Sequence, residues 1–95
     1  MRKVTQKTVQ AFRNNVNFKQ GNTRVETLGN ETRLYLHDNL IAKRTPNGLF
    51  ITNAGWQSNT TKERLNGLPN VSIHQKNWQW YLNGKKWNGE LTKVD

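Results

Sequence analysis

The chain contains no cysteine among its 95 residues, and it is also short of proline, acidic side chains and long apolar runs. Without cysteine there is no disulfide framework, no thiol chemistry and no zinc site of the cysteine type. No apolar stretch approaches the roughly 20 residues of a membrane span. No apolar run follows Arg2 and Lys3, as it would in a signal peptide. We therefore expect a soluble cytoplasmic protein with no membrane partner.

The shortage of acidic residues leaves a strong positive charge. Six Asp and Glu stand against fifteen Lys and Arg, which gives a formal net charge of +9. The basic residues are spread along the chain, so the charge indicates a folded basic surface and not a disordered arm. Such a surface attracts polyanions: nucleic acid first, an acidic protein face second and anionic lipid third. The alternative is that the charge serves solubility alone.

Hydrophobic residues make up only 33% of the chain, a lean supply for a domain of 95 residues. The four tryptophans must therefore provide much of the core, because each ring can bury roughly 150 to 250 Å². Three of the four lie between Val71 and Gly89. We expect residues 1–95 to form a single α+β domain, with loose ends at 1–3 and 91–95.

The stretch from Val71 to Gly89 predicts a three-stranded meander. Asn83-Gly84 is a strong hairpin signal, because a type I′ turn needs positive φ at both central residues. Lys76-Asn77 is a weaker candidate for the other turn. Side chains alternate between the two faces of a strand, so this register separates an apolar core face from a polar face. The core face is expected to hold Val71, Ile73, Trp78, Trp80, Leu82 and Trp87, and the polar face Ser72, His74, Gln79, Tyr81, Lys86 and Asn88.

The rest of the chain predicts an N-terminal helix, an antiparallel meander and a short helix. Thr5 is the expected N-cap of a helix that ends near Asn14 or Asn15. The short helix is expected over 61–66, with Thr60 and Glu63 at capping-box spacing. Both faces of the first meander carry apolar residues, so we expect this sheet to be covered on both sides. Residues 18–22 are expected to be a connector, followed by strands at 23–28 (an edge strand), 32–37, 40–44 and 49–53, with turns at 29–30, 38–39 and 45–48.

Side chains of catalytic type are few. A two-histidine ribonuclease would need one imidazole as base and the other as acid. His37 is expected at a hairpin tip and His74 on the C-terminal meander, so nothing brings the two rings together. Paired carboxylates, metal-binding spacing, a P-loop and a nucleophile elbow are all missing from the sequence. We expect no enzyme, no cofactor and no metal.

Three places are candidates for nucleic-acid binding. The first is the polar face of the C-terminal meander, where aromatic rings can stack on bases while lysines hold phosphates. The second is the start of the short helix, whose free N–H groups suit a phosphate. The third is a basic cluster across one hairpin of the first meander. Each has a structural alternative: an ordinary exposed tyrosine, a capping threonine with a core tryptophan, or a solvated basic surface. The candidates are Tyr81, Lys86 and His74 in the first group, Lys62, Arg64 and Trp56 in the second, and Arg33, Lys43 and Arg44 in the third.

The chain also resembles a family of small proteins from tailed bacteriophages. The resemblance lies in the motifs NAGW, TTKERLNGL and WYLNGxxW and covers Leu34 to Gly89. The family pattern often has an acidic residue after the last tryptophan, where this chain has Asn88. The resemblance implies a phage gene product that acts in the host bacterial cytoplasm, and it assigns no functional residues.

We therefore predict a non-enzymatic phage protein that binds nucleic acid through a basic antiparallel sheet. RNA or single-stranded DNA is favoured over duplex, because nothing resembles a recognition helix with base-reading side chains. The alternative is an inhibitor that uses the same surface to bind one host protein, such as a defence or transcription factor.

Overall fold

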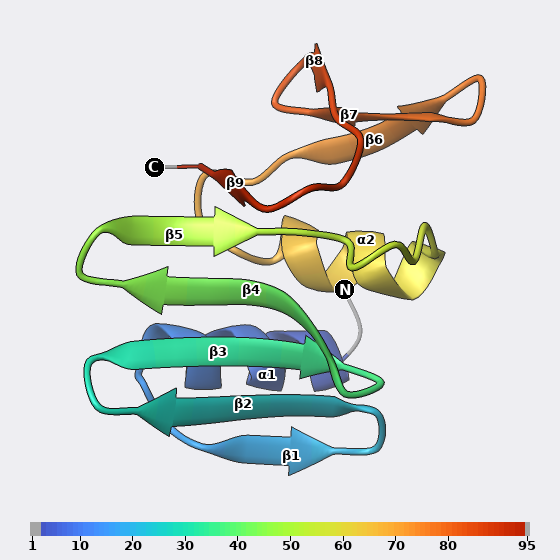
Figure 1. Cartoon of the computed structure of the whole chain (residues 1–95). Helices are drawn as coiled ribbons and strands as arrows, with labels where there is room; N and C mark the ends of the chain where they lie inside the picture. Colours follow the sequence, from blue (N-terminus) through green and yellow to red (C-terminus); the bar gives the residue numbers. More distant parts are fainter. Residues whose placement is uncertain (1–2, 95) are drawn as a thin grey trace.

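The computed structural model of the protein describes residues 3–94, and it confirms the predicted α+β class. A helix, an antiparallel meander, a second helix and a three-stranded meander follow one another, and a short strand returns to the first sheet (Figure 1). The elements are α1 (Lys3–Arg13), β1 (Phe18–Gln20), β2 (Thr23–Leu28), β3 (Glu31–Leu36), β4 (Asn39–Thr45), β5 (Gly48–Ile51), α2 (Asn59–Asn66), β6 (Ile73–Lys76), β7 (Gln79–Leu82), β8 (Lys85–Lys86) and β9 (Thr92–Lys93).

The large sheet has six antiparallel strands in the order β1-β2-β3-β4-β5-β9. The expected connector at 18–22 contains β1, so β2 is an inner strand and not the edge strand that was expected. The sequence did not predict β1 because its three residues are too few to show the alternating pattern of a strand. The loose ends expected at 1–3 and 91–95 are also wrong in part, since Lys3 begins α1 and Thr92 pairs with Ile51. Residues 1, 2 and 95 lie outside the described residues.

Within residues 3–94, one face of the large sheet is covered and the other is not, so the expected cover on both sides is wrong. A β-bulge explains the difference: Leu34 pairs with Ala42 and Tyr35 with Leu40, which leaves Ile41 as an extra residue. Both Ile41 and Ala42 are thereby buried, although they are neighbours in one strand. Figure 1 shows α1 behind the strands and the opposite face uncovered. Tyr35, Leu40 and Phe50 lie on that uncovered face and are half-exposed.

Helix α1 already includes Lys3, three residues before the expected first helical residue Gln6, so Thr5 is not its N-cap. Thr5 is buried within the helix, and its hydroxyl donates to Oε1 of Glu63 over 2.7 Å. The helix ends at Arg13, where the guanidinium of Arg44 donates to the carbonyl of Phe12 over 2.6 Å and to that of Arg13 over 3.3 Å. A cation at this position also favours the negative end of the helix dipole.

Helix α2 is capped by Ser58 and not by Thr60. The Ser58 hydroxyl accepts a hydrogen bond from the N–H of Thr61 over 3.1 Å. The capping box expected with Glu63 is wrong, because that carboxylate instead accepts from Thr5 on α1 and from the neighbouring Arg64. The helix is therefore held by side-chain bonds to other elements as well as by its cap.

The small sheet has the strand order β6-β7-β8, and one of its two turns is where the sequence predicts it. Asn83-Gly84 connects β7 to β8, with Leu82 opposite Lys85. The other turn is at Asn77-Trp78, one residue later than expected, and Ile73 consequently pairs with Leu82 and not with Trp80. Each β6 residue therefore pairs two positions further along β7 than expected. Side chains alternate every residue, so a shift of two leaves the strand residues on their expected faces.

Trp78 is the exception to that face assignment. It lies in the turn with 86% of its surface exposed, so its expected place in the core is wrong. Trp80 and Trp87 are buried together as expected, with ring centroids 6.3 Å apart. Their side of the small sheet joins the same core as the large sheet and the helices. The other side of the small sheet is left facing solvent.

Candidate nucleic-acid interface

The solvent side of the small sheet carries a row of side chains that we call the outer face: His74, Lys76, Gln79, Tyr81 and Lys86. Tyr81 on the central strand lies opposite His74 on one side and opposite Lys86 on the other. The His74 and Tyr81 rings are stacked, with centroids 5.2 Å apart and an angle of 8° between their planes. The register expected from turns at Lys76-Asn77 and Asn83-Gly84 also places Tyr81 opposite Lys86, but it would place His74 opposite Gln79 and not opposite Tyr81.

The stacked pair lies at an edge of the small sheet, because β6 is an outer strand. His74 is exposed, and among residues 3–94 no further strand lies on the side of its ring that faces away from Tyr81. The backbone beneath is held in place by Asn66, whose side-chain amide donates to the carbonyl of Ile73 over 2.9 Å and accepts from its N–H over 2.6 Å. A planar group can therefore extend the stack from a fixed edge.

The charge around the outer face has one sign. The sequence contains no Asp or Glu from residue 64 to residue 89, between Glu63 and Glu90. Lys76, Lys85 and Lys86 are exposed in this segment, and none of them forms an ion pair within residues 3–94. Their positive charge is therefore available to an external anion.

The uncovered side of the large sheet, which we call the open face, is also basic, but its own carboxylates neutralise part of the charge. Arg24 contacts Glu26 over 3.0 Å and Asp38 over 2.8 Å, and Arg33 contacts Glu31 over 3.0 Å. The side-chain hydrogen bond to Glu31 raises the pKa of the Arg33 guanidinium above its ordinary value. These two arginines are already paired.

The aromatic rings of the open face are also occupied by the protein's own cations. The guanidinium of Arg24 lies 4.4 Å from the centre of the Tyr35 ring, and the ammonium of Lys43 lies 5.7 Å from the centre of the Phe50 ring. Arg33 and Lys43 are directly opposite one another, so these two members of the predicted basic cluster are neighbours. A base that stacked here would have to displace these contacts, so the open face is the weaker candidate.

The remaining candidates do not join either face. Arg44 points to the covered side of the sheet, where it binds the end of α1 and lies over the Phe12 ring. Arg64 is 2% exposed and bonds to Thr5, Thr23 and Glu63, so it is a structural residue and cannot reach a phosphate. Lys62, its half-exposed neighbour on α2, lies on the helical side of the sheet.

Trp56 lies in the loop between β5 and α2 with 60% of its surface exposed, so it does not fill the core. It borders a pocket of about 450 Å³ together with His37 and Thr60. His37 is in the turn after β3, with Nε2 3.2 Å from the side-chain amide of Asn22. The two histidines thus lie on hairpins of different sheets, and the arrangement that a two-histidine ribonuclease needs is not present in the described residues.

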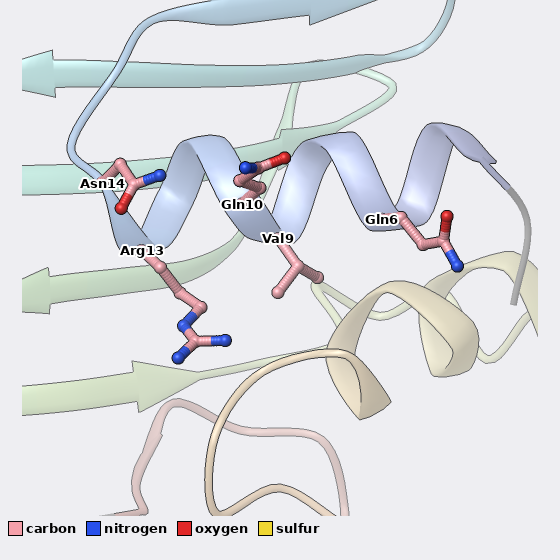
Figure 2. A pocket seen from close by; sticks show the side chains of 5 residues that line it. All are labelled: Gln6, Val9, Gln10, Arg13 and Asn14. Carbon is pink, nitrogen blue, oxygen red and sulfur yellow. The ribbon is translucent and has the colours of Figure 1, made fainter.

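A second hollow of about 450 Å³ runs along α1. Figure 2 shows that Gln6, Val9 and Arg13 point from α1 toward α2 and the loop after it. Its described lining contains amides, one guanidinium and one valine but no aromatic ring, so it lacks the ring surface that the outer face offers. Within residues 3–94 there is no cluster of three potential metal ligands, and no helix there is long and apolar enough to cross a membrane.

Lys76 and Trp78 were not singled out by the sequence prediction, although both belong to the hairpin that presents the outer face. Lys76 was placed in a turn and Trp78 in the core. The missed signal was Asn77, because asparagine takes the first central position of the type I′ turn here as Asn83 does in the second hairpin, with φ of +53° and +51°.

Fold and site together define a small basic α+β protein with one uncovered, acid-free strand surface. The comparison with protein families then gives a particular assignment. Residues 1–93 match the model described as Kyanoviridae Gp96 protein, and the chain belongs to this family of phage proteins. That description names no activity, substrate or partner. Neither the curated proteins nor the solved structures that were searched contain a match.

Proposed function

We propose that this phage protein binds single-stranded nucleic acid, RNA or DNA, through the outer face, as a non-enzymatic protein in the host cytoplasm. The observation that supports this is the parallel pair His74–Tyr81 at the β6 edge of the small sheet, with Lys86 opposite Tyr81 and no carboxylate from residue 64 to 89. Rings stack on bases, and lysines contact phosphates. A surface without acidic groups does not repel a polyanion.

Single strands suit this surface better than duplex. The bases of a duplex already stack on one another, so their planes are not free to meet a protein ring. The exposed ring side of His74 needs an unstacked base that can lie parallel to it. No sequence preference follows, since every base has a planar face and stacking tolerates all of them.

The outer face is favoured over the open face by its free charge and free ring surface. On the open face, Arg24 and Arg33 are paired with carboxylates and both rings lie against cations. On the outer face, Lys76 and Lys86 have no such partner within residues 3–94. An incoming phosphate therefore gains contacts at the outer face without breaking existing ones.

Binding of the wild-type chain to oligo(rU), oligo(dT) and a mixed-sequence duplex at low and moderate salt tests the proposal. Each neutralised phosphate on a single strand contributes about −0.7 to the slope of log affinity against log salt. With Lys76 and Lys86 available on the outer face, we expect a slope of roughly −1.4 for the single strands and weaker binding to the duplex. Absent or salt-independent binding contradicts the proposal. Retention of one host protein in a pull-down, combined with absent binding, would support an inhibitor instead.

A further inference from the structure

Trp78 is placed where neither packing nor backbone preference favours a tryptophan. It is 86% exposed, the most exposed of the large hydrophobic side chains in residues 3–94. Its φ is +67°, in the left-handed region that bulky side chains avoid. Burial of the indole therefore does not offset the backbone strain. A residue that is both strained and exposed in this way is a candidate for function.

The second hairpin of the same small sheet provides a direct comparison. Both turns have two central residues with positive φ, and both have asparagine first. Gly84 follows Asn83 with φ +86°, as the turn type prefers, whereas Trp78 follows Asn77. The protein thus contains the favourable Asn-Gly pair in one turn and a strained Asn-Trp pair in the equivalent turn.

We propose that Trp78 is a base-stacking anchor for single-stranded nucleic acid at the tip of the β6–β7 hairpin. This inference rests on the proposed function and adds a second stacking position to the outer face. Figure 1 shows the β6–β7 turn at the free end of its hairpin, away from the six-stranded sheet. The indole at this tip can therefore contact a nucleic-acid strand without interference from the rest of the fold.

The hairpin also supplies contacts that link the tip to the stacked pair. Lys76 and Gln79 form the last cross-strand pair before the turn, and His74 and Tyr81 form a pair further along. The His74–Tyr81 pair lies two strand positions from the Lys76–Gln79 pair, roughly 7 Å at about 3.3 Å per residue, and Trp78 directly precedes Gln79. A strand of several nucleotides can stack on both positions, with Lys76 between them.

Charge complementarity identifies the partner class. An exposed tryptophan also suits an apolar pocket on a host protein, but the segment from residue 64 to 89 has only basic charges. Lys76 is two residues from the indole, and Lys85 and Lys86 are on the same small sheet. An anionic polymer with planar groups satisfies both the charges and the ring.

The test uses the full chain, the probe oligo(dT), and the variants Trp78→Ala, Trp78→Phe and Trp78→Gly. We expect Trp78→Ala to bind roughly 5- to 150-fold more weakly, the range for loss of one stacked base. The slope with salt should not change, because no phosphate contact is removed. Trp78→Phe should keep most of the affinity. Quenching of tryptophan fluorescence on binding should be largely lost in Trp78→Phe, since Trp80 and Trp87 are buried and the exposed Trp56 lies in the loop between β5 and α2, outside the small sheet.

Trp78→Gly separates binding from folding. It creates the Asn-Gly turn found at 83–84, so we expect a higher melting temperature together with the weak affinity of Trp78→Ala. The matched control is Trp56→Ala, which removes the other exposed indole and should leave the affinity unchanged. A Trp78→Gly variant that melts below the wild type would overturn the argument from strain.

The outcomes distinguish this inference from the proposed function. If the wild type binds neither oligo(dT) nor oligo(rU), the proposed function fails and the anchor with it. If it binds only oligo(rU), the same variants are compared on that probe. If the wild type binds and Trp78→Ala binds equally well, only the anchor is overturned. Equal oligo(dT) binding combined with loss of a retained host protein in Trp78→Ala would overturn it in favour of a protein partner.

Discussion

The imidazole of His74 lies parallel to the phenol ring of Tyr81, with the two centroids 5.2 Å apart. This contact depends on the position of one turn. With the turn at Asn77-Trp78, His74 is directly opposite Tyr81. A turn at Lys76-Asn77 would put His74 opposite Gln79 and return Trp78 to a strand. The same displacement of the turn therefore stacks the two rings and exposes the indole.

Replacement of Trp80 by alanine should destabilise the protein strongly. Trp80 is 1% exposed and packs beside Trp87 between the small sheet and the rest of the core. We expect a loss of about 3 to 5 kcal/mol in the free energy of unfolding, as for other buried tryptophans. Chemical denaturation measures it. Trp78→Ala is the control and should change stability by less than about 0.5 kcal/mol. A Trp80→Ala variant that melts like the wild type would show that the faces are wrongly assigned.

Replacement of Gly89 by alanine should be costly for two reasons. Gly89 has φ +90°, and a Cβ there would lie 2.1 Å from Nδ2 of the buried Asn53. The Gly89 carbonyl also accepts from the Asn53 N–H over 3.1 Å, so the two backbones cannot separate freely. We expect a loss of roughly 3 kcal/mol or more in unfolding free energy, from strain and overpacking together.

Gly55→Ala is the matched control for that prediction. Gly55 has a similar φ of +84°, but a Cβ added there would have open space around it, with nothing within 4 Å. Gly55→Ala should therefore lose only the backbone strain of about 1 to 2 kcal/mol in unfolding free energy. Equal losses in the two alanine variants, measured by denaturant midpoint, would mean that the contact with Asn53 does not constrain position 89.

Arg64 should prove essential for folding and not for binding. Its buried guanidinium connects Thr5 on α1 with Thr23 on β2, and it contacts Glu63 over 2.8 Å. Arg64→Ala leaves these groups with fewer partners in a buried site, and we expect a loss of about 3 kcal/mol in stability. The neighbouring change Lys62→Ala should cost about 0.5 kcal/mol or less. Equal melting temperatures for the two variants would contradict this role.

Much of the fold could be predicted because its signals are local. Asn83-Gly84 fixed the second hairpin of the small sheet, and with it the pair Tyr81–Lys86. Alternation then placed Trp80 and Trp87 in the core. These features follow from turn chemistry and strand periodicity within a few residues.

The errors came from features that local patterns do not reveal. The bulge at Ile41 shifts the strand by one residue, so most apolar side chains of β3, β4 and β5 are buried on the covered face, and only Tyr35, Leu40 and Phe50 lie on the open face. Arg64 is buried because Thr5, which lies far away in the sequence, accepts its hydrogen bond. Strain at Trp78 runs against the residue preferences that a prediction must use, and such conflicts are expected at functional positions.

The most direct test of the central claim is the affinity for oligo(rU) of a variant that carries Tyr81→Ala and Lys86→Glu. We expect it to bind at least about tenfold more weakly than the wild type, because one ring and one phosphate contact are lost, and to melt at nearly the same temperature. The matched variant with Tyr35→Ala and Lys43→Glu on the open face should bind almost as the wild type does. Unchanged affinity in the first variant, or an equal loss in both, would contradict binding at the outer face.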